Sequence, residues 1–484
     1  LIQKIHYPIA IRSSSLLEDS QYQPLSGMYA TYMLPNIHKD DNVRFNLLCD
    51  AIKQVYASTF YKEAAALIES SIHALEEEKM AVVIMELVGQ TSENRFYPTF
   101  SGTAQSFNYY PVSYMHRNEG VAFVALGLGR TVAAGEKSLR FSPEYPTILP
   151  QYYSIKATLA SSQNSFYALN LDKKSDDLLS GESTNLDIFE LIVAEKDSVL
   201  SWVGSVVSHE DNVIRDSLKH EGTRVITFAP VLKFGVFPLT EILKKLLTIG
   251  KRSFGCEIEI EFAVNLSKDK DTPHEFCLLQ IKPMVLGVSD DLVQEREHDP
   301  DNIICHSSLT LGNGKFNEIQ NIVYVDPNNF DRSKSKYIAK EIDKITSKIG
   351  SKTPYMLIGP GRWGTEDPWL GIPIKWQQIH GAKIIVEVGM PKFPVDPSFG
   401  SHFFQNVTSM RLGYFTVNHK SKEDKLNTKW LSEQRVVKEE KYTKWIQTDD
   451  PFTVVIDGKT GKGNIVKPIP LEPEIMDEHE ASLI

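Results

Sequence analysis

The sequence predicts a mixed α/β (α+β) protein with more than one domain. Its 484 residues exceed the roughly 100–200 residues that a single domain usually contains. Hydrophobic residues make up 42% and charged residues 24%, which is typical of globular proteins with packed cores. Apolar residues recur with strand-like spacing in some segments and with helical spacing in others. We therefore expect helices packed against sheets.

The charge balance and the cysteines exclude several classes of protein. A formal net charge of −10 argues against a surface that neutralises nucleic-acid phosphates. No apolar run approaches the roughly 20 residues that span a bilayer. The four cysteines are scattered and form no C-x-x-C pair, which favours reduced thiols. We expect a cytoplasmic protein that binds neither nucleic acid nor membrane.

The start of the chain predicts an N-terminal truncation. Residue 1 is Leu1, and a strand-like pattern begins almost at once at residues 5–11. No basic segment followed by an apolar segment is present, so a signal peptide is not expected. We therefore expect further sequence upstream.

The first 80 residues predict a strand, a polar loop and a helix. Residues 5–11 form the strand, and RSSSLLEDSQYQPLSG forms the loop. Apolar residues then recur at helical spacing, at Leu47, Leu48, Ala51, Ile52, Val55, Tyr56 and Phe60. The continuous apolar run at residues 80–88 predicts a further strand, which Gly89 ends.

Residues 81–290 predict a larger second part. Residues 141–221 are more polar and less regular, and we interpret them as an insertion. The segment LTEILKKLLTIGKRSFG predicts an amphipathic helix closed by glycines. The last two predicted strands would form a hairpin around the polar turn NLSKDKDTPH. Four strands are predicted, at residues 97–107, 121–128, 257–264 and 275–281.

The final third predicts a separate domain. A linker-like composition places a boundary near residue 295, and residues 300–470 would form a C-terminal α/β domain. Its predicted elements are a helix at 334–349 and strands at 355–358 and 383–388. Residues 471–484 are acidic and predict a weakly ordered tail.

Arg12 lies at the end of the first predicted strand and precedes Ser13, Ser14 and Ser15. The arginine fork matches phosphate oxygens, and neighbouring hydroxyls and backbone amides supply further donors. The pattern therefore indicates an anion-binding position. It also fits a serine-rich loop with a surface arginine, so the residues alone leave both interpretations open.

Glu259 and Glu261 lie two residues apart on one predicted strand. Side chains with this spacing project from the same face, so the two carboxylates converge. Mg²⁺ is commonly held by one or two carboxylates together with substrate phosphates. The pair therefore indicates a metal site, although an exposed strand face would show the same spacing.

The next strand and three glycine-bearing loops carry further candidates. Gln280 and Lys282 share one face of the partner strand. Lys282 fits either a cross-strand ion pair with the glutamates or a phosphate contact. Glycines at Gly27, at Gly102 and within residues 127–135 would let the backbone approach a phosphate, although each also fits an ordinary turn.

Taken in order, these segments resemble the nucleotide-binding domain of phosphoenolpyruvate synthase and pyruvate, phosphate dikinase. The resemblance covers about residues 5–285. It rests on IAIRSSSLLEDSQYQPLSG, MAVVIMELVG, GLGRTVAAG, and EIEIEFAV followed by FCLLQIKPM. That family has an ATP-grasp fold. The resemblance therefore implies that residues 1–80 and 81–290 form two ATP-grasp subdomains that bind ATP and Mg²⁺.

The resemblance also assigns roles to individual residues. Glu259 and Glu261 would hold Mg²⁺, and the backbone near Glu86 and Val88 would read adenine. Arg12 and Lys282 would also be catalytic, because phosphoryl transfer depends on positioning and on cationic stabilisation of the phosphate oxygens. The implied nucleotide-binding residues are Arg12, Ser13, Ser14, Glu86, Val88, Gly102, Gln280 and Lys282.

Four positions depart from the family pattern. Glu259 replaces an aspartate, and Met85 replaces the glutamine of the hinge. Arg130 replaces a glutamate, which reverses a charge, and Lys282 replaces an arginine, which loses the bidentate fork. These departures bear on catalysis more than on nucleotide binding.

Two features of the last third carry chemistry. Glycines surround Arg362 in the segment GPGRWG, a composition that suits either an anion-binding loop or structural packing. His402 in FGSHFFQNV follows Gly-Ser and precedes a helical pattern, which resembles the phosphohistidine motif of the dikinase family. A histidine at a helix start finds backbone donors for a phosphate nearby. The other interpretation is a packed core histidine.

The expected function is therefore that of a Mg²⁺- and ATP-binding phosphotransferase. It would move a phosphoryl group from ATP to a histidine, either His402 or a histidine of a phosphoacceptor domain or protein. One alternative is a nucleotide-binding regulatory or scaffold module without turnover. Another is an ATP-grasp ligase-like enzyme with Arg362 as a substrate clamp. The sequence does not predict an oligomeric state.

Overall fold

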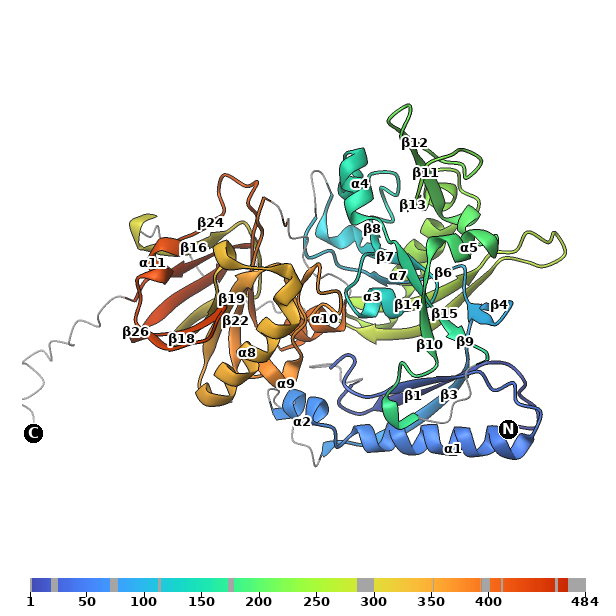
Figure 1. Cartoon of the computed structure of the whole chain (residues 1–484), viewed down its shortest axis with the longest axis horizontal. Helices are drawn as coiled ribbons and strands as arrows, with labels where there is room; N and C mark the ends of the chain where they lie inside the picture. The colour runs from blue at the N-terminus through green and yellow to red at the C-terminus, as the bar shows by residue number, and fades with distance from the viewer. Residues whose placement is uncertain are drawn as a thin grey trace, which may run out of the picture. The chain divides into compact units, whose positions relative to one another are not determined.

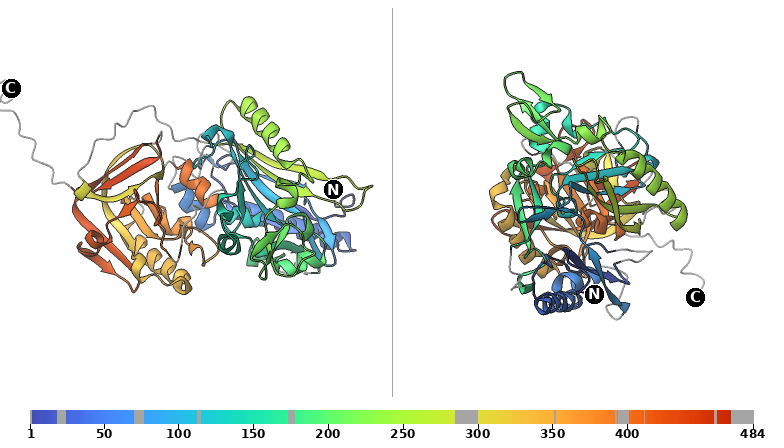
Figure 2. Two further views of the ribbon diagram at one scale, coloured as in Figure 1. Left: turned by 90° about the horizontal axis from the view of Figure 1, so that it is seen from above. Right: turned by 90° about the vertical axis from the view of Figure 1, so that its right-hand side faces the viewer.

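The computed structural model describes residues 2–18, 25–69, 77–111, 115–172, 178–284, 300–350, 352–391, 393, 401–410, 412–457 and 460–468. The chain divides into two compact units (Figures 1 and 2). The first unit comprises Leu1–Leu286, Trp363–His380 and Ser398–Arg411. The second comprises Gly287–Arg362, Gly381–Pro397 and Leu412–Ile484. Two segments from the last third of the sequence therefore belong to the first unit.

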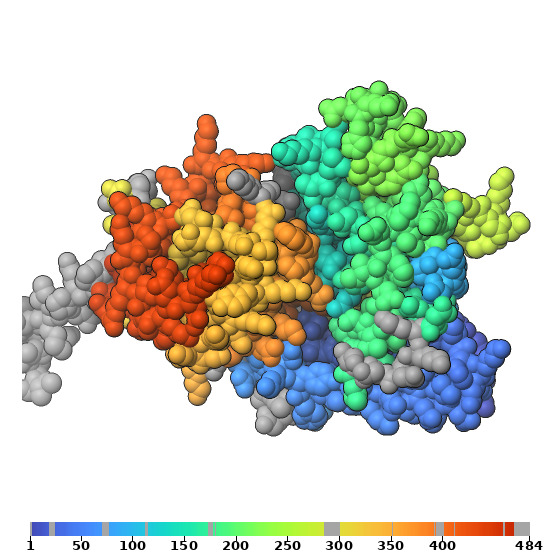
Figure 3. Space-filling model, viewed as in Figure 1, coloured from blue at the N-terminus to red at the C-terminus, as the bar shows by residue number. Residues whose placement is uncertain are grey.

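A three-stranded antiparallel sheet in the order β2-β1-β3 begins the first unit. Its strands are β1 (Ile9–Ser15), β2 (Thr31–Leu34) and β3 (Met80–Glu86). One face packs against α1 (Asp41–Ser58), where Leu48 and Val55 share a core with Ile9 and Ile11. The outer sides of α1 and of α2 (Lys62–Glu69) lie at the surface (Figure 3). Because side chains alternate along a strand, Arg12 projects from the opposite face of β1.

Two details of this region differ from the sequence prediction. The helix is confirmed, but Tyr56 is exposed and Phe60 lies beyond the end of α1, so the buried stripe is narrower. Ser13, Ser14 and Ser15 continue β1 instead of starting a loop, because each pairs with a residue of β3. Backbone pairing here outweighs the turn preference of a serine run.

A five-stranded antiparallel sheet in the order β15-β14-β6-β7-β8 forms the larger part of the first unit. The helix α7 (Leu239–Phe254) packs against it through Leu239, Leu243 and Leu247 (Figure 2). The predicted helix and the four predicted strands of this region are confirmed. The strands of the sheet are β6 (Phe100–Gln105), β7 (Val121–Leu126), β8 (Leu139–Phe141), β14 (Ile258–Asn265) and β15 (Glu275–Pro283).

Two smaller sheets complete the first unit, in the orders β10-β9-β5-β4 and β12-β11-β13. Residues 141–221 are more regular than their polar composition predicts, because Phe166 and Leu169 of β9 are buried in the main core. The strands are β4 (Gln90–Ser92), β5 (Arg95–Tyr97), β9 (Ser165–Asn170), β10 (Leu186–Glu190), β11 (Gly204–Ser208), β12 (Val213–Arg215) and β13 (Thr223–Ile226). The short helices are α3 (Arg130–Ala133), α4 (Ile155–Ser161), α5 (Leu191–Lys196) and α6 (Ala229–Leu232).

The second unit is built on one large mixed sheet. The neighbouring strands β18, β19, β22 and β23 run parallel, and α8 (Ser335–Ile349) connects the first two. The predicted helix at 334–349 and the predicted strands at 355–358 and 383–388 are confirmed. The strands are β16 (Ile303–Ser307), β17 (Leu309–Leu311), β18 (Gly314–Val325), β19 (Tyr355–Pro360), β22 (Ala382–Val388), β23 (Gly413–Val417), β24 (Lys425–Leu426), β25 (Val436–Glu439), β26 (Thr443–Asp457) and β27 (Lys462–Val466), with α11 (Thr428–Ser432) between β24 and β25.

The segments that join the first unit from the last third carry α9 (Trp376–Ile379) and α10 (His402–Ser409). The short strands β20 (Arg362–Trp363) and β21 (Gly371–Ile372) pair with each other at the start of the first of these segments. The helix α9 lies beside α2, where Lys375 Nζ is 3.0 Å from Glu63 Oε1 (Figure 1). The rings of Trp376 and Phe403 stack with centroids 4.8 Å apart. The sequence groups both segments with residues 300–470, whereas these packing contacts attach them to the first unit.

The described residues also bear on three sequence-based predictions, which concern membrane-spanning helices, the cysteines and the acidic tail. None of the helices in this part of the chain has the length and apolar composition required to cross a bilayer. The four cysteines are present as thiols. The predicted acidic tail, residues 471–484, lies outside the described residues.

Candidate functional site

A cavity of about 280 Å³ lies between the two main sheets of the first unit. Its volume is close to the lower end of the range for small-molecule sites. β1, β2 and β3 contribute one side, β6, β14 and β15 contribute another, and the glycine-bearing loop before α3 and the start of α10 complete the wall. The sequence-predicted residues that line it are Arg12, Gly27, Glu86, Val88, Gly102, Glu261, Gln280, Lys282 and His402. Ser13, Ser14 and Glu259 are not among its lining residues.

Arg12 connects the two sheets. Its Nη2 donates to Gln280 Oε1 at 2.7 Å, so a side chain of β1 meets one of β15. Ser13 faces the other way and is buried, with its Oγ donating to Glu18 Oε2 at 2.7 Å. Ser14 is half-buried on the face of Arg12. Of the three predicted phosphate-binding residues on β1, Arg12 alone reaches the cavity wall.

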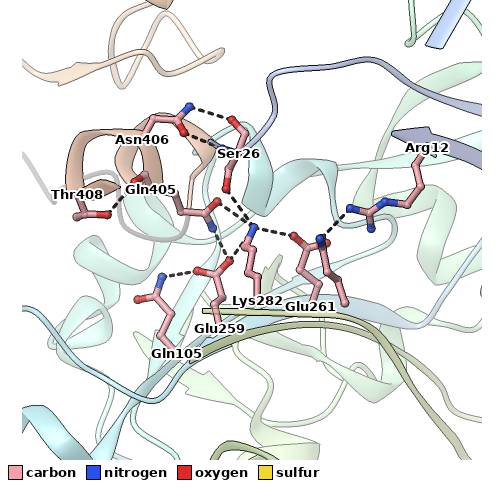
Figure 4. A network of polar contacts seen from close by, with 10 residues as sticks. Arg12, Ser26, Gln105, Glu259, Glu261, Lys282, Gln405, Asn406 and Thr408 are labelled. Atoms are coloured by element: carbon pink, nitrogen blue, oxygen red, sulfur yellow. Dashed lines mark hydrogen bonds and ion pairs between the residues drawn. The ribbon is translucent and has the colours of Figure 1, made fainter. Parts of the chain in front are cut away.

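The register between β14 and β15 brings four predicted side chains together. Glu259 lies opposite Lys282, and Glu261 lies opposite Gln280. Lys282 Nζ is 3.3 Å from Glu259 Oε1 and 3.3 Å from Glu261 Oε1, so the ammonium lies between the two carboxylates (Figure 4). Lys282 Nζ also donates to Ser26 Oγ at 3.2 Å. Both cross-strand pairs follow from the spacing of two residues on each strand.

Glu259 is almost completely buried, at 2% exposure, and amides engage both of its carboxylate oxygens. Gln105 Nε2 donates to Oε2 at 2.6 Å, and Gln405 Nε2 donates to Oε1 at 2.5 Å. Burial raises the pKa of this carboxyl, against the opposing effects of Lys282 and of the Gln105 hydrogen bond. In this arrangement Glu259 does not present an open oxygen to the main cavity.

Glu261 faces the cavity and is held ionised. Burial opposes its charge, but Lys282, and then Arg12 and His402, lower the pKa of Glu261 below its usual value. The pKa of Lys282 is raised because the two carboxylates outweigh the opposing effect of burial. Lys282 and Glu261 are therefore both charged at neutral pH.

Glu261 is better placed than Glu259 to bind a magnesium ion, because of the two only Glu261 lines the main cavity. Mg²⁺ prefers oxygen ligands, and it takes one or two carboxylates together with phosphate and water oxygens. Glu261 offers such oxygens at the cavity wall, whereas the side-chain oxygen of its cross-strand neighbour Gln280 accepts from Arg12. Within the described residues no group of three or more histidine, cysteine, aspartate or glutamate side chains is arranged to hold a metal. A metal here would therefore depend on oxygens supplied by a bound nucleotide.

His402 is the first residue of α10. Ser401 precedes it as the N-cap, and Ser401 Oγ accepts from Phe404 N–H at 3.2 Å. Gly27 has a φ of 65° and lies directly against the imidazole, so a Cβ there would overlap His402 Nδ1. Burial, followed by the charge of Lys282, lowers the pKa of His402 to about 4. The imidazole is therefore neutral at pH 7 and retains a lone pair on one nitrogen.

Sequence reasoning missed the polar side chains of α10 other than His402. Gln405 reaches Glu259 and Lys282, and the side chain of Asn406 pairs with the backbone of Ser26. A signal was present, because residues three and four apart on a helix share a face. The spacing H-x-x-Q-N therefore places the side chains of His402, Gln405 and Asn406 on one face of α10.

The remaining wall combines apolar side chains with one more cation. Met85, Leu87 and Phe262 supply flat or flexible apolar surface near the predicted hinge. The other cation is Arg130, a departure from the family pattern. It forms ion pairs at 3.1 Å with Glu182, which also lines the cavity, and at 3.1 Å with Glu366. Arg362, the clamp of the ligase-like alternative, belongs to the second unit.

A comparison with known protein families identifies a family to which the chain is similar. The family described as pyruvate phosphate dikinase, AMP/ATP-binding domain, matches residues 2–301, which is more than half of the chain. No curated protein matches the chain. The family match confirms the resemblance found in the sequence, and it supports an ATP-grasp-like α+β fold and the binding of adenine nucleotide. The chain belongs to the family of the pyruvate phosphate dikinase AMP/ATP-binding domain.

Proposed function

We propose that this protein binds ATP with Mg²⁺ and transfers a phosphoryl group from ATP to His402 of its own chain. The observation that carries the proposal is that His402 lines the same cavity as Arg12, Glu261 and Lys282. A nucleophile, two cations and a carboxylate therefore meet in one cavity, within a chain of a nucleotide-binding family.

The chemistry follows from the protonation state of the histidine. A neutral imidazole has an unprotonated nitrogen whose lone pair attacks a phosphorus atom of ATP. A P–N bond forms, the bond from that phosphorus to its bridging oxygen breaks, and the nucleotide leaves with that electron pair. Because Nδ1 lies against Gly27, we expect Nε2 to be the attacking nitrogen. Arg12 and Lys282 would stabilise the negative charge on the phosphate oxygens.

Glu261 would hold the magnesium ion together with oxygens of the nucleotide. When bound, Mg²⁺ would neutralise charge on the phosphates and orient them. The backbone around Glu86 and Val88 lines the cavity and would contact the base. Apolar neighbours such as Met85 and Phe262 suit the flat surface of a nucleobase.

Labelled ATP tests the proposal. The full chain is incubated with Mg²⁺ and either γ- or β-labelled ATP, and acid-labile phosphoprotein is mapped to a peptide. We expect label on His402 and its loss in the variant His402→Asn. His380→Asn is the control, because His380 lies outside the cavity lining and its Nδ1 contacts Gln377 O. Label that persists in His402→Asn would contradict transfer to this residue.

A second candidate is a regulatory module that binds nucleotide without turnover. Lys282 and Arg130 favour it, because both cations already have carboxylate partners within the chain. This candidate predicts saturable ATP binding with neither acid-labile label nor nucleotide hydrolysis. The same labelling experiment therefore separates the two functions.

A further inference from the structure

We propose that Glu259 is a positioning residue for α10. Its carboxylate binds Gln405 and not a metal ion, and this contact keeps His402 at the cavity. The inference deepens the proposed function, and it rests on that function only for the role of His402. It differs from the sequence-based expectation that Glu259 and Glu261 act as a pair of metal ligands.

The surroundings of Glu259 leave little room for a metal. Its carboxylate lies at a second, smaller cavity of about 30 Å³ that is also lined by Gln105, Lys282 and Gln405. Both carboxylate oxygens of Glu259 already accept a hydrogen bond from an amide, and the ammonium of Lys282 lies 3.3 Å from Oε1. A metal at Glu259 would have to displace Gln105, Gln405 or Lys282 from the carboxylate.

The amide of Gln405 is oriented by its two charged neighbours. Its Nε2 donates to Glu259 Oε1 at 2.5 Å, and its Oε1 accepts from Lys282 Nζ at 3.3 Å. The donor end therefore meets the negative charge, and the acceptor end meets the positive charge. Hydrogen bonds to ionised groups are about twice as strong as those between neutral groups, so this pairing fixes both the side chain and its orientation.

One turn of helix connects Gln405 to His402. The two residues are three apart on α10, so they share a face of the helix. Further contacts hold the same helix: the Asn406 amide bonds to Ser26, and Phe403 stacks on Trp376. Figure 4 shows the side chain of Gln405 reaching from α10 to Glu259 on β14. We therefore expect a change at Glu259 to alter, through Gln405, the position of His402 on the same helix.

A glutamine at position 259 would disrupt the hydrogen bonds from Gln105 and Gln405, although its side chain has nearly the same size as that of glutamate. A carboxylate accepts hydrogen bonds at both oxygens, and here it accepts one from Gln105 and one from Gln405. The amide of a glutamine has only one acceptor oxygen, so its N–H₂ group would face the N–H₂ group of one of these partners. The variant Glu259→Gln therefore loses one of the two bonds and gains a donor–donor contact.

A reciprocal exchange keeps the hydrogen bonds but moves the charge. In the double variant Glu259→Gln with Gln405→Glu, the new amide would accept from Gln105 and donate to the new carboxylate on α10. That carboxylate would also face Lys282. The double variant restores the connection to α10, while position 259 no longer carries a carboxylate that could bind a metal.

The test uses the full chain and two measurements that do not depend on phosphoryl transfer. Hydrogen–deuterium exchange follows the amides of α10, and calorimetry measures the Mg²⁺-dependent affinity for a non-hydrolysable ATP analogue. We expect Glu259→Gln to accelerate exchange in α10 about tenfold or more and to change the affinity by less than about twofold. The double variant is expected to restore most of the protection.

Thr408→Val, on the same helix, is the control for this test. Thr408 Oγ1 donates to Gln405 O at 2.8 Å within its own turn, and the substitution leaves the side chains of Glu259 and Gln405 intact. Because the connection between β14 and α10 is retained, exchange in α10 should stay close to that of the wild-type chain, and the affinity should again change by less than about twofold.

Two results would overturn the proposal. The first is a loss of Mg²⁺-dependent affinity in Glu259→Gln as large as that in Glu261→Gln, with unchanged exchange in α10. The second is a folded double variant whose α10 exchanges as fast as in Glu259→Gln. If the double variant does not fold, Glu259→Gln alone decides between the two roles. If His402 takes no label in the wild-type chain, the proposed function fails while the exchange data still test the role of Glu259.

Discussion

The side chain of Asn406 pairs with both backbone groups of Ser26. Ser26 N–H donates to Asn406 Oδ1 at 2.7 Å, and Asn406 Nδ2 donates to Ser26 O at 2.8 Å. The two residues are 380 positions apart in the sequence, so this is a long-range connection of the loop before β2 to α10. The contact uses the backbone of Ser26, so it does not depend on which side chain stands at position 26.

Asn406→Leu should therefore loosen α10. The variant keeps a similar volume but leaves the N–H and the carbonyl of Ser26 buried without this partner, at a cost of about 1–3 kcal/mol for an unsatisfied polar group. Urea unfolding should show a lower free energy of unfolding, and exchange in α10 should accelerate. An Asn406→Leu protein as stable as wild type would show that the pairing contributes nothing.

Gly27→Ala should displace His402. The new methyl group would overlap the imidazole, and a φ of 65° costs a non-glycine residue roughly 1–2 kcal/mol. Gly235→Ala is a matched control, because Gly235 has a φ of 64° and no residue beyond its chain neighbours comes within 4 Å of its would-be Cβ. Labelling from ATP should fall in Gly27→Ala and not in Gly235→Ala. Equal labelling of the two variants would argue against an acceptor histidine that lies beside Gly27.

Glu261→Gln should reduce the Mg²⁺-dependent part of ATP binding. Removing one oxygen ligand or its charge commonly costs about tenfold or more in metal affinity. Glu257→Gln is the control, because Glu257 contacts Ser106 Oγ at 2.5 Å and is not among the lining residues of the cavity. Calorimetry at several magnesium concentrations measures the effect. Equal losses in both variants would indicate a general effect of removing negative charge.

The neutral state of His402 predicts a pH dependence of stability. The folded protein holds its pKa at about 4, whereas an unfolded histidine titrates near 6.5. Between these values the unfolded chain binds more protons, so this residue makes stability rise with pH from about 4 to about 6.5. Urea unfolding of wild type and His402→Asn at pH 4.5, 5.5 and 7 measures the difference. The difference in the free energy of unfolding between wild type and His402→Asn should shift in favour of wild type as the pH rises. A difference that does not change with pH would contradict the low pKa of His402.

The local geometry of the strand-borne half of the candidate site can be predicted from the sequence. The spacing of two residues in EIEIEF and in LLQIKPM fixes which side chains share a face, and antiparallel pairing then places Glu261 opposite Gln280. Arg12 is predicted for a different reason, because an arginine fork beside three serines matches phosphate oxygens. These relationships are local, and the hairpin requires no knowledge of the rest of the chain.

The other half depends on contacts between distant parts of the sequence. Nothing near Glu259 indicates that Gln405, 146 residues later, occupies one of its oxygens. Composition places residues 398–411 with their sequence neighbours, whereas Phe403 and Asn406 find partners in the first unit. Ser13 illustrates the same limit, because its burial beside Glu18 follows from packing and not from the serine run itself.

The contribution of α10 to the first unit has a consequence for synthesis on the ribosome. The strand β15 is complete at Pro283, but the cavity wall that it shares with His402 and Gln405 requires the chain up to Ser409. At roughly 5–20 residues per second, the ribosome needs roughly 6–25 s to add the intervening segment. During that interval Lys282 and Glu259 have been translated without the helix that will cover them. The nascent first unit therefore lacks the part of its cavity wall that α10 supplies while the second unit is still being made.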